Sequence, residues 1–157
     1  MKSLVVYYSR TGNARFVAQT VAAQIGADIE EVVDLKKRSG PLGFISGGRD
    51  ASRGKETEIA SSTKSPADYD LIIIGTPIWA GHPTPAITTY LKKTDLSGKK
   101  VAVFFVQGGK KPQGIEQIKS LIPGSNYVGE LSVIDALKNK AESEKQIEDW
   151  CETLTAN

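Results

Sequence analysis

The chain alternates short, continuous apolar runs with stretches in which apolar residues recur at helical spacing. Residues 4–8, 71–74 and 101–106 are apolar throughout, which is typical of strands buried on both faces of a parallel sheet. Two weaker runs predict a second strand at Asp28 to Val33, with Ile29, Val32 and Val33 as its apolar part, and a last strand at residues 128–134. We therefore expect five strands, with residues 71–74 at the centre of the sheet.

Helical periods fill the gaps between these runs. Apolar residues at positions 14, 17, 18, 21 and 25 predict a first helix, and residues 85–92, 114–121 and 141–154 predict three more. Strands that alternate with helices indicate βαβ units and a parallel sheet covered by helices on both faces. The sequence thus predicts an α/β fold of three layers around an open, doubly wound, five-stranded parallel sheet.

Composition narrows the class of protein without identifying it. The 157 residues, 39% hydrophobic and 24% charged, suit a single domain spanning residues 1–157. No apolar run approaches the roughly 20 residues of a membrane span. Residues 1–3 lead directly into a strand without a signal-peptide pattern, so we expect a cytoplasmic protein.

Single residues exclude further classes of site. Cys151 is the only cysteine and His82 the only histidine, so neither an intramolecular disulfide nor a cluster of Cys and His metal ligands can form. The net charge is +2, without a zinc pattern, an aromatic RNA-binding motif or a basic stripe. We therefore expect neither a metal site nor a nucleic-acid partner.

The turn between the first strand and the first helix carries the strongest functional signal. It contains the hydroxyls of Ser9 and Thr11, followed by Gly12 and Asn13. Backbone N–H groups at a helix start, together with the helix dipole, bind anions, and hydroxyls add further donors. A phosphate is the natural occupant, although a purely structural turn can have the same composition.

Two further loops follow the carboxyl ends of the third and fourth strands, where doubly wound sheets bind ligands. Prolines and glycines fix the first loop, residues 75–85, which presents Trp79. That indole either stacks on a planar ring or anchors the loop in the core. In the second loop, Gly108 and Gly109 leave backbone N–H groups open to a ring, because no Cβ blocks the approach.

Together the three loops resemble the FMN-binding loops of the flavodoxin family. Ser9, Thr11 and Gly12 match the phosphate-loop pattern S/T-x-T-G-x-T/S, with Ala14 in place of the last hydroxyl. Residues 76–79 resemble the second loop, in which a Trp covers one flavin face, and residues 107–109 resemble the third. The resemblance covers essentially the whole chain, at the spacing of short-chain flavodoxins, and implies the strand order 2-1-3-4-5 with FMN as cofactor. The residues that it assigns to FMN are Ser9, Arg10, Thr11, Gly12, Asn13, Ala14, Thr76, Pro77, Ile78, Trp79, Ala80, Gly81, Gln107, Gly108 and Gly109.

The third loop departs from that of electron-transfer flavodoxins. It has no Tyr to stack on the second flavin face, and Lys110 and Lys111 stand where acids are usual. Ammonium groups stabilise the anionic reduced flavin, which nearby carboxylates would destabilise. We therefore expect an open flavin face and a higher hydroquinone potential than in acidic flavodoxins.

Residues 35–67 do not fit the simple alternation. Residues 40–51 are too glycine-rich to predict a robust helix, so we expect a long functional or disordered connection. The segment resembles a G-x-x-x-G-G-x-x-A stretch of one branch of small flavodoxin-like proteins. We expect a packing role, with Leu42, Phe44 and Ile45 docking part of the segment; the alternative is that Arg49 or Arg53 lies close to the cofactor edge.

Three functions remain open. The resemblance implies an FMN-binding electron-transfer protein that docks to redox partner proteins, as a monomer or homodimer and without catalytic residues of its own. An FMN-dependent NAD(P)H:quinone-type reductase would instead use the open flavin face for a nicotinamide donor and then a small acceptor. A degenerate flavodoxin-fold binding module without flavin is the third hypothesis, for which Ala14 is the main argument.

Overall fold

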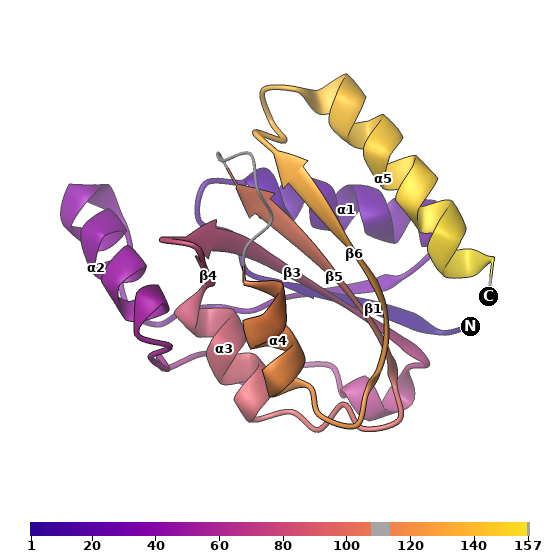
Figure 1. Ribbon diagram of the computed structural model, residues 1–157, viewed down its shortest axis with the longest axis horizontal. Coiled ribbons are helices and arrows are strands. Elements are labelled where there is room, and N and C mark those ends of the chain that lie inside the picture. Colours follow the sequence, from indigo (N-terminus) through magenta and orange to yellow (C-terminus); the bar gives the residue numbers. More distant parts are fainter. Residues whose placement is uncertain (108–113, 157) are drawn as a thin grey trace.

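A parallel sheet with helices on both of its faces organises the molecule (Figure 1). The structure is a computed structural model that describes residues 1–107 and 114–156. Its elements in chain order are β1 (Ser3–Tyr7), α1 (Asn13–Ile25), β2 (Asp28–Glu31), α2 (Gly40–Ser52), the 3-10 helix η1 (Pro66–Asp68), β3 (Leu71–Trp79), β4 (His82–Pro83), α3 (Pro85–Lys92), β5 (Lys100–Gln107), α4 (Ile115–Leu121), β6 (Asn126–Ile134) and α5 (Lys140–Thr155).

The sheet has the strand order β2-β1-β3-β5-β6, and the short β4 pairs with β3 outside this path. With β4 set aside, this is the expected order 2-1-3-4-5, and the fold class is confirmed. The pairings between these five strands are all parallel. As expected, β3 is central, and Ile72, Ile73 and Ile74 are fully buried because both faces of the strand are covered.

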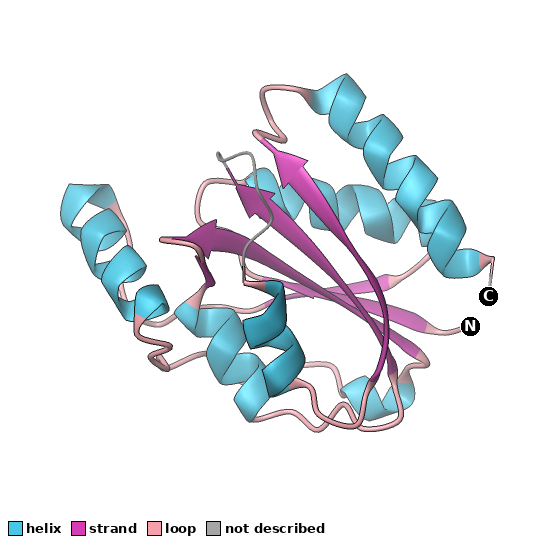
Figure 2. Cartoon of the chain, viewed as in Figure 1, coloured by secondary structure: helices cyan, strands magenta, loops and turns pink. Residues whose placement is uncertain are grey.

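Each face of the sheet packs against its own pair of helices (Figure 2). On one face, Val17 of α1 and Ile147 of α5 cover the sheet, and on the other Ile87 of α3 and Ile118 of α4 do so. Cys151 is one of the buried residues of α5, and burial raises the pKa of its thiol to about 11. The thiol therefore stays protonated at neutral pH. Among the described residues, none of the helices combines the length and apolarity that a bilayer-spanning helix needs.

The second strand is shorter than its sequence predicts. β2 ends at Glu31, and Ile29 and Val33, expected in its apolar part, are both exposed, whereas Val32 is buried. β2 lies at the edge of the sheet, where one neighbouring strand and partial cover leave apolar side chains in water. The β-branched composition indicated a strand but could not show which of its faces would be covered.

The glycine-rich segment forms a helix, α2, so the prediction of an irregular connection is wrong. The buried positions of α2 are Gly43, Gly47, Asp50 and Ala51. A Cβ on Gly43 would collide with the main chain of Arg38, and one on Gly47 would lie 2.9 Å from the Trp79 ring. The predicted docking of Leu42, Phe44 and Ile45 is also wrong, because all three side chains are exposed. The glycines allow the backbone of α2 to approach Arg38 and Trp79 closely, and this packing outweighs their poor helix propensity.

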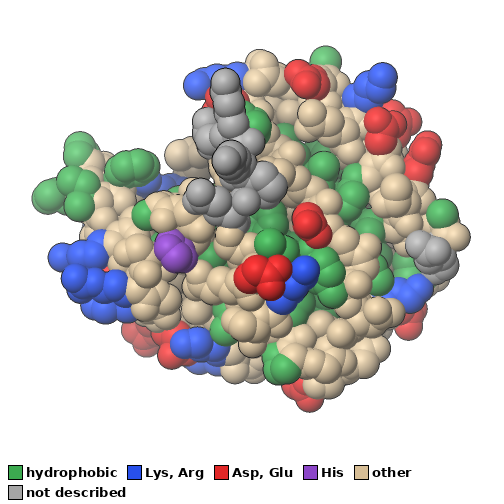
Figure 3. All heavy atoms as spheres, in the orientation of Figure 1, with side chains coloured by type: hydrophobic (Ala, Val, Ile, Leu, Met, Phe, Trp, Pro, Cys, Tyr) green, Lys and Arg blue, Asp and Glu red, His purple; other side chains and the backbone are tan. Residues whose placement is uncertain are grey.

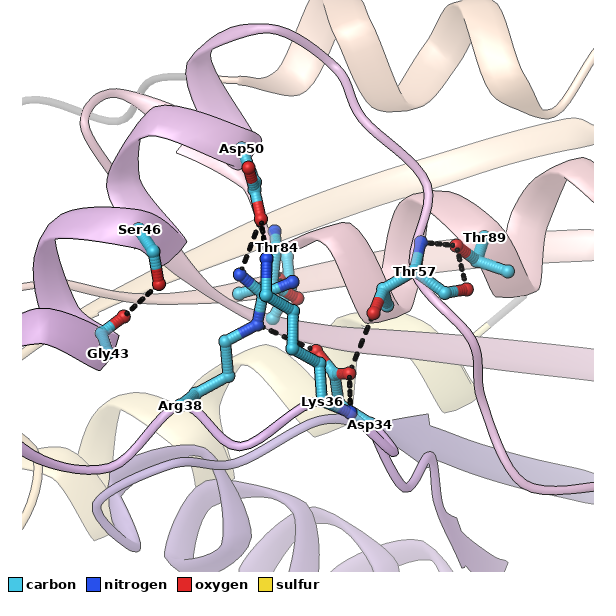
Figure 4. A network of polar contacts seen from close by, with 10 residues as sticks. Asp34, Lys36, Arg38, Gly43, Ser46, Asp50, Thr57, Thr84 and Thr89 are labelled. Carbon is cyan, nitrogen blue, oxygen red and sulfur yellow. Dashed lines mark hydrogen bonds and ion pairs between the residues drawn. The ribbon is translucent and has the colours of Figure 1, made fainter.

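A buried ionic network holds α2 in this place (Figure 4). Asp50 accepts hydrogen bonds from Lys36 Nζ at 2.8 Å and from Arg38 Nη1 at 2.7 Å, and Arg38 Nε donates to Asp34 at 3.1 Å. Asp34 also accepts a bond from the Thr57 hydroxyl, and the Thr57 N–H donates to Thr89 of α3. The side chains of Asp34, Arg38 and Asp50 are at most 6% exposed. The network therefore ties α2 to the segment after β2 and, through Thr57, to α3.

We expect Asp50→Asn to destabilise the protein by about 3 kcal/mol, because removing one member of a buried ion pair leaves its partners uncompensated. Urea unfolding at pH 7 measures this change. Asp149→Asn, at an exposed position of α5, is the matched control and should change stability by less than about 0.5 kcal/mol. Equal stability of the two variants would contradict a structural role for the network.

The Asp50 carboxylate also predicts how the stability of the protein depends on pH. Hydrogen bonds from Lys36 and Arg38 lower the pKa of Asp50 to about 2, whereas the pKa of an unfolded Asp is about 3.9. A lowered pKa in the folded state contributes stability above about pH 4 that is lost as the pH falls towards 2. Urea unfolding across this window should therefore show a steeper loss for the wild type than for Asp50→Asn.

Candidate functional site

A hollow lies at the carboxyl ends of β1, β3 and β5, where the sheet order reverses direction. It is a cavity of about 180 Å³. The turn after β1, the ends of β3 and β5, α2 and the segment after β6 contribute to its lining. The lining residues are Ser9, Arg10, Thr11, Asn13, Ala14, Phe44, Pro77, Ile78, Trp79, Val106, Gln107 and Asp135. The turn after β1 and the ends of β3 and β5, which lie far apart in the sequence, thus meet at one place with α2, which the sequence did not predict.

The turn after β1 has the geometry of an anion site. Gly12, with φ of 98°, precedes the first turn of α1, and its N–H donates to Ser9 Oγ at 3.1 Å. Thr11 Oγ1 accepts a bond from Asn13 Nδ2 at 3.2 Å. Because each hydroxyl accepts a bond inside the turn, its own proton remains available to a ligand. The N–H groups of the first helical turn have no partner within the helix and point the same way.

Trp79 lies at the end of β3 and pairs with His82 of β4 across a tight turn. The expectation that Trp79 lies on a loop is therefore wrong, because β3 continues to this residue. Its ring meets the edge of Tyr8, with the ring centroids 5.6 Å apart at 84°, and lies against Gly47. The indole nevertheless remains partly exposed and lines the hollow. It both anchors α2 and forms a wall of the site.

Phe44 supplies a second aromatic side chain at the hollow, and the sequence analysis did not assign it to the site. The guanidinium carbon of Arg10 lies 5.3 Å from the centre of the Phe44 ring and 6.0 Å from that of Trp79. Arg10 also donates to the carbonyl of Gly40 at 3.3 Å, at the start of α2. The spacing of Gly43, Gly47 and Ala51, one or two turns apart, was the signal that could have revealed this helix and its outward-facing Phe44.

The other predicted site residues are divided between the hollow and its surroundings. Thr76 is fully buried, and its hydroxyl lies 3.1 Å from that of Thr84. Ala80 lines an adjoining groove, and Gly12 and Gly81 shape turns through a positive φ without lining the hollow. His82, which we did not assign a catalytic role, lies 2.8 Å from Gln117 through Nδ1.

The glycine loop after β5 can be followed only at its start. Gln107 lines the hollow and donates through Nε2 to Ser132 at 3.0 Å, and no described residue donates a hydrogen bond to its amide oxygen. The predictions for Gly108, Gly109, Lys110 and Lys111 lie outside the described residues. Val106 and Asp135 also line the hollow, and no motif in the sequence identified them. The carboxylate of Asp135 is 4.0 Å from the ammonium group of Lys138, whose side chain is exposed.

These residues suit a molecule with a phosphate at one end and a planar ring at the other. The hydroxyls of Ser9 and Thr11 and the start of α1 offer donors, while Trp79 and Phe44 offer aromatic surfaces. The available amide oxygen of Gln107 can accept a bond from a ring N–H. The donor set therefore fits FMN.

A doubly wound sheet with a phosphate turn and aromatic residues at its switch point defines the flavodoxin-like class of α/β proteins. A family model for flavodoxin matches residues 46–154. The chain therefore belongs to the flavodoxin family.

Solved structures from two bacteria are similar over nearly the whole chain. A crystal structure of a proposed flavoprotein from Bacteroides uniformis is 26% identical, with a TM-score of 0.79, and the match covers 96% of this chain and 97% of the other. A flavoprotein from Lactobacillus acidophilus in complex with FMN is 25% identical, with a TM-score of 0.74 and coverage of 89% and 97%. The NMR structure of the apo-form from the same organism is 26% identical, with a TM-score of 0.64 and coverage of 88% and 95%.

The contact between α2 and Trp79 can be tested with two adjacent glycines. Gly47→Ala would place a Cβ 2.9 Å from the indole, so we expect a loss of about 1–3 kcal/mol in stability and a shift of Trp79 fluorescence. A Cβ on Gly48 would lie 3.8 Å from its nearest neighbour, Ala80. Gly48→Ala should therefore stabilise the helix by up to about 1 kcal/mol and leave the fluorescence unchanged. Urea unfolding followed by tryptophan emission separates the two, and identical behaviour would disprove the close packing.

Proposed function

We propose that this protein binds FMN in the hollow and transfers electrons to or from a redox partner. Membership of the flavodoxin family and the FMN complex of the Lactobacillus acidophilus relative support the predicted cofactor. The observation that carries the proposal is the meeting of the phosphate turn, Trp79 and Gln107 in one cavity. FMN supplies one- and two-electron chemistry when it is bound.

The chain's own residues would hold and cover the cofactor. The Ser9 and Thr11 hydroxyls and the N–H groups at the start of α1 bind the phosphate, and Trp79 covers the ring on the side of β3. Pro77 and Ile78 would offer apolar surface to the ring, while the Gln107 amide oxygen would accept a bond from a ring N–H. Ala14 offers no hydroxyl, so the phosphate depends on the remaining donors of the turn.

Phe44 favours an electron carrier over a reductase. The absence of a Tyr in the third loop suggested an open flavin face that could admit a nicotinamide. Phe44 instead brings an aromatic ring to the same hollow as Trp79, with the Arg10 guanidinium near both rings. This leaves less room for a nicotinamide to stack, whereas an electron can pass through the exposed edge of the site to a docked protein.

The phosphate assignment predicts a difference between FMN and riboflavin. Thr11→Ala should lower the affinity for FMN about tenfold, because it removes one hydrogen bond to a charged group, worth about 1.5 kcal/mol. The same change should leave riboflavin affinity unaffected, since riboflavin has no phosphate. Quenching of flavin fluorescence measures both constants, and Ser62→Ala, at an exposed position remote from the hollow, is the control. An equal loss for both flavins would refute the assignment of Thr11 to the phosphate.

The carrier and the reductase differ in their response to nicotinamides. We expect the FMN-loaded protein, kept anaerobic, to keep its flavin absorbance with NADH or NADPH and to bleach with dithionite. Rapid bleaching by either nicotinamide would establish a reductase instead. Failure to bind FMN even at high micromolar concentration would exclude both and leave the flavin-free binding module.

A further inference from the structure

α2 turns its small residues towards the rest of the protein and its large apolar residues towards water. Leu42, Phe44 and Ile45 are 81%, 65% and 66% exposed, and we call these three side chains the apolar ridge. Helices on protein surfaces normally turn such residues inward. Figure 3 shows the hydrophobic side chains gathered over α2 at the left edge of the molecule, with Lys and Arg side chains beside them. Clustered exposed apolar residues typically mark an interaction surface.

A groove runs beside the ridge, between α2 and the turn that joins β3 to β4. Phe44, Ile45, Gly48 and Arg49 line it on one side, and Ile78, Trp79 and Ala80 line it on the other. Phe44, Ile78 and Trp79 also line the hollow proposed to bind FMN. The groove and the cofactor site therefore share walls, so an occupant of the groove lies next to the cofactor.

Among the described residues, the exposed charged side chains on α2 and within three residues of its ends are cationic. Arg49 lines the groove, and Arg49, Arg53 and Lys37 are all exposed. The single acid within α2, Asp50, is buried and neutralised by Lys36 and Arg38. The next acid along the chain, Glu56, lies 3.6 Å from Lys92 of α3. The outer face of α2 is thus apolar and cationic.

We propose that the apolar ridge, the groove and the cationic pair Arg49 and Arg53 form the docking surface for an acidic redox protein. This inference rests on the proposed function and names the partner class for it. Carboxylates of the partner would pair with the two arginines, and one protruding apolar side chain would enter the groove. A concave groove favours a protein partner over a lipid surface, because a bilayer offers no protruding side chain to fill it.

Electron transfer at this surface is a simple exchange. With FMN bound, one electron would pass from the reduced redox centre of the partner, which becomes oxidised, to the flavin, and no bond would form or break between the two proteins. Because Trp79 and Phe44 border both the groove and the cofactor site, the docked partner needs no rearrangement of this chain to reach it. Charge complementarity raises the encounter rate and makes it sensitive to salt.

The test uses a plant-type [2Fe–2S] ferredoxin as an acidic probe, reduced and mixed anaerobically with the FMN-loaded protein in a stopped-flow instrument. We expect the second-order rate constant to fall about tenfold or more between about 10 mM and about 300 mM salt. The double variant Arg49→Glu/Arg53→Glu should lower the rate at low salt by about tenfold or more. Lys93→Glu/Lys145→Glu, with the same change in net charge at exposed positions of other elements, should lower it less than about threefold.

A separate double variant tests the contribution of the apolar ridge to docking. Leu42→Ser/Ile45→Ser alters two exposed side chains and spares Phe44, so FMN affinity should stay unchanged. We expect a rate several-fold lower, with the same dependence on salt as the wild type. A rate that rises with salt, equal losses in the two charge-reversal variants, or no effect of the serine variant would overturn the proposal.

A binding measurement without flavin separates this inference from the proposed function. Fluorescence anisotropy of labelled, oxidised ferredoxin should show binding to the FMN-free protein at low salt, weakened by Arg49→Glu/Arg53→Glu. If this binding occurs while FMN titration fails, the docking surface stands and the proposed function falls. Sedimentation with phosphatidylglycerol vesicles, abolished by Leu42→Ser/Ile45→Ser, together with no ferredoxin binding, would assign the surface to a membrane and refute an acidic protein partner.

Discussion

The close approach of α2 to the rest of the molecule is the constraint on which the site and its outer surface depend. It is possible because Gly43 and Gly47 carry no side chain where Arg38 and Trp79 stand. The buried carboxylate of Asp50, bonded to Lys36 and Arg38, fixes the helix in that place. Because small residues and the paired carboxylate of Asp50 fill the inner face, the larger apolar side chains face outward.

This arrangement couples stability, cofactor site and surface through a few side chains. Trp79 packs on Gly47, meets Tyr8 edge-on and still lines the hollow. Phe44 faces the same hollow from α2, and both aromatic residues continue into the groove. A change that displaces α2 would therefore alter the wall of the hollow as well as the outer surface of the helix.

The parts of the fold that follow a regular pattern could be predicted from the sequence. Uninterrupted apolar runs indicated the buried strands, and α3 has the predicted bounds, Pro85–Lys92. The Ser9-to-Asn13 turn was recognisable because donors at a strand-to-helix junction are a local feature. The single domain over residues 1–157 and the FMN contacts of individual residues stay predictions. The sequence analysis did not place Phe44 at the hollow because the glycines around it argue against a helix on propensity alone. In the structure those glycines are the contact surface of α2.

The sequence by itself determined the buried strands and the turn from Ser9 to Asn13, since these depend on local composition and periodicity. The strand order came from the resemblance to a family. Only the tertiary structure decided that residues 40–52 form a helix, that Thr76 is buried, and that Phe44 and Asp135 reach the hollow. Those outcomes depend on what each residue meets across the fold. In α2 the poor helix propensity of glycine is offset because another backbone or ring occupies the space that a side chain would have taken.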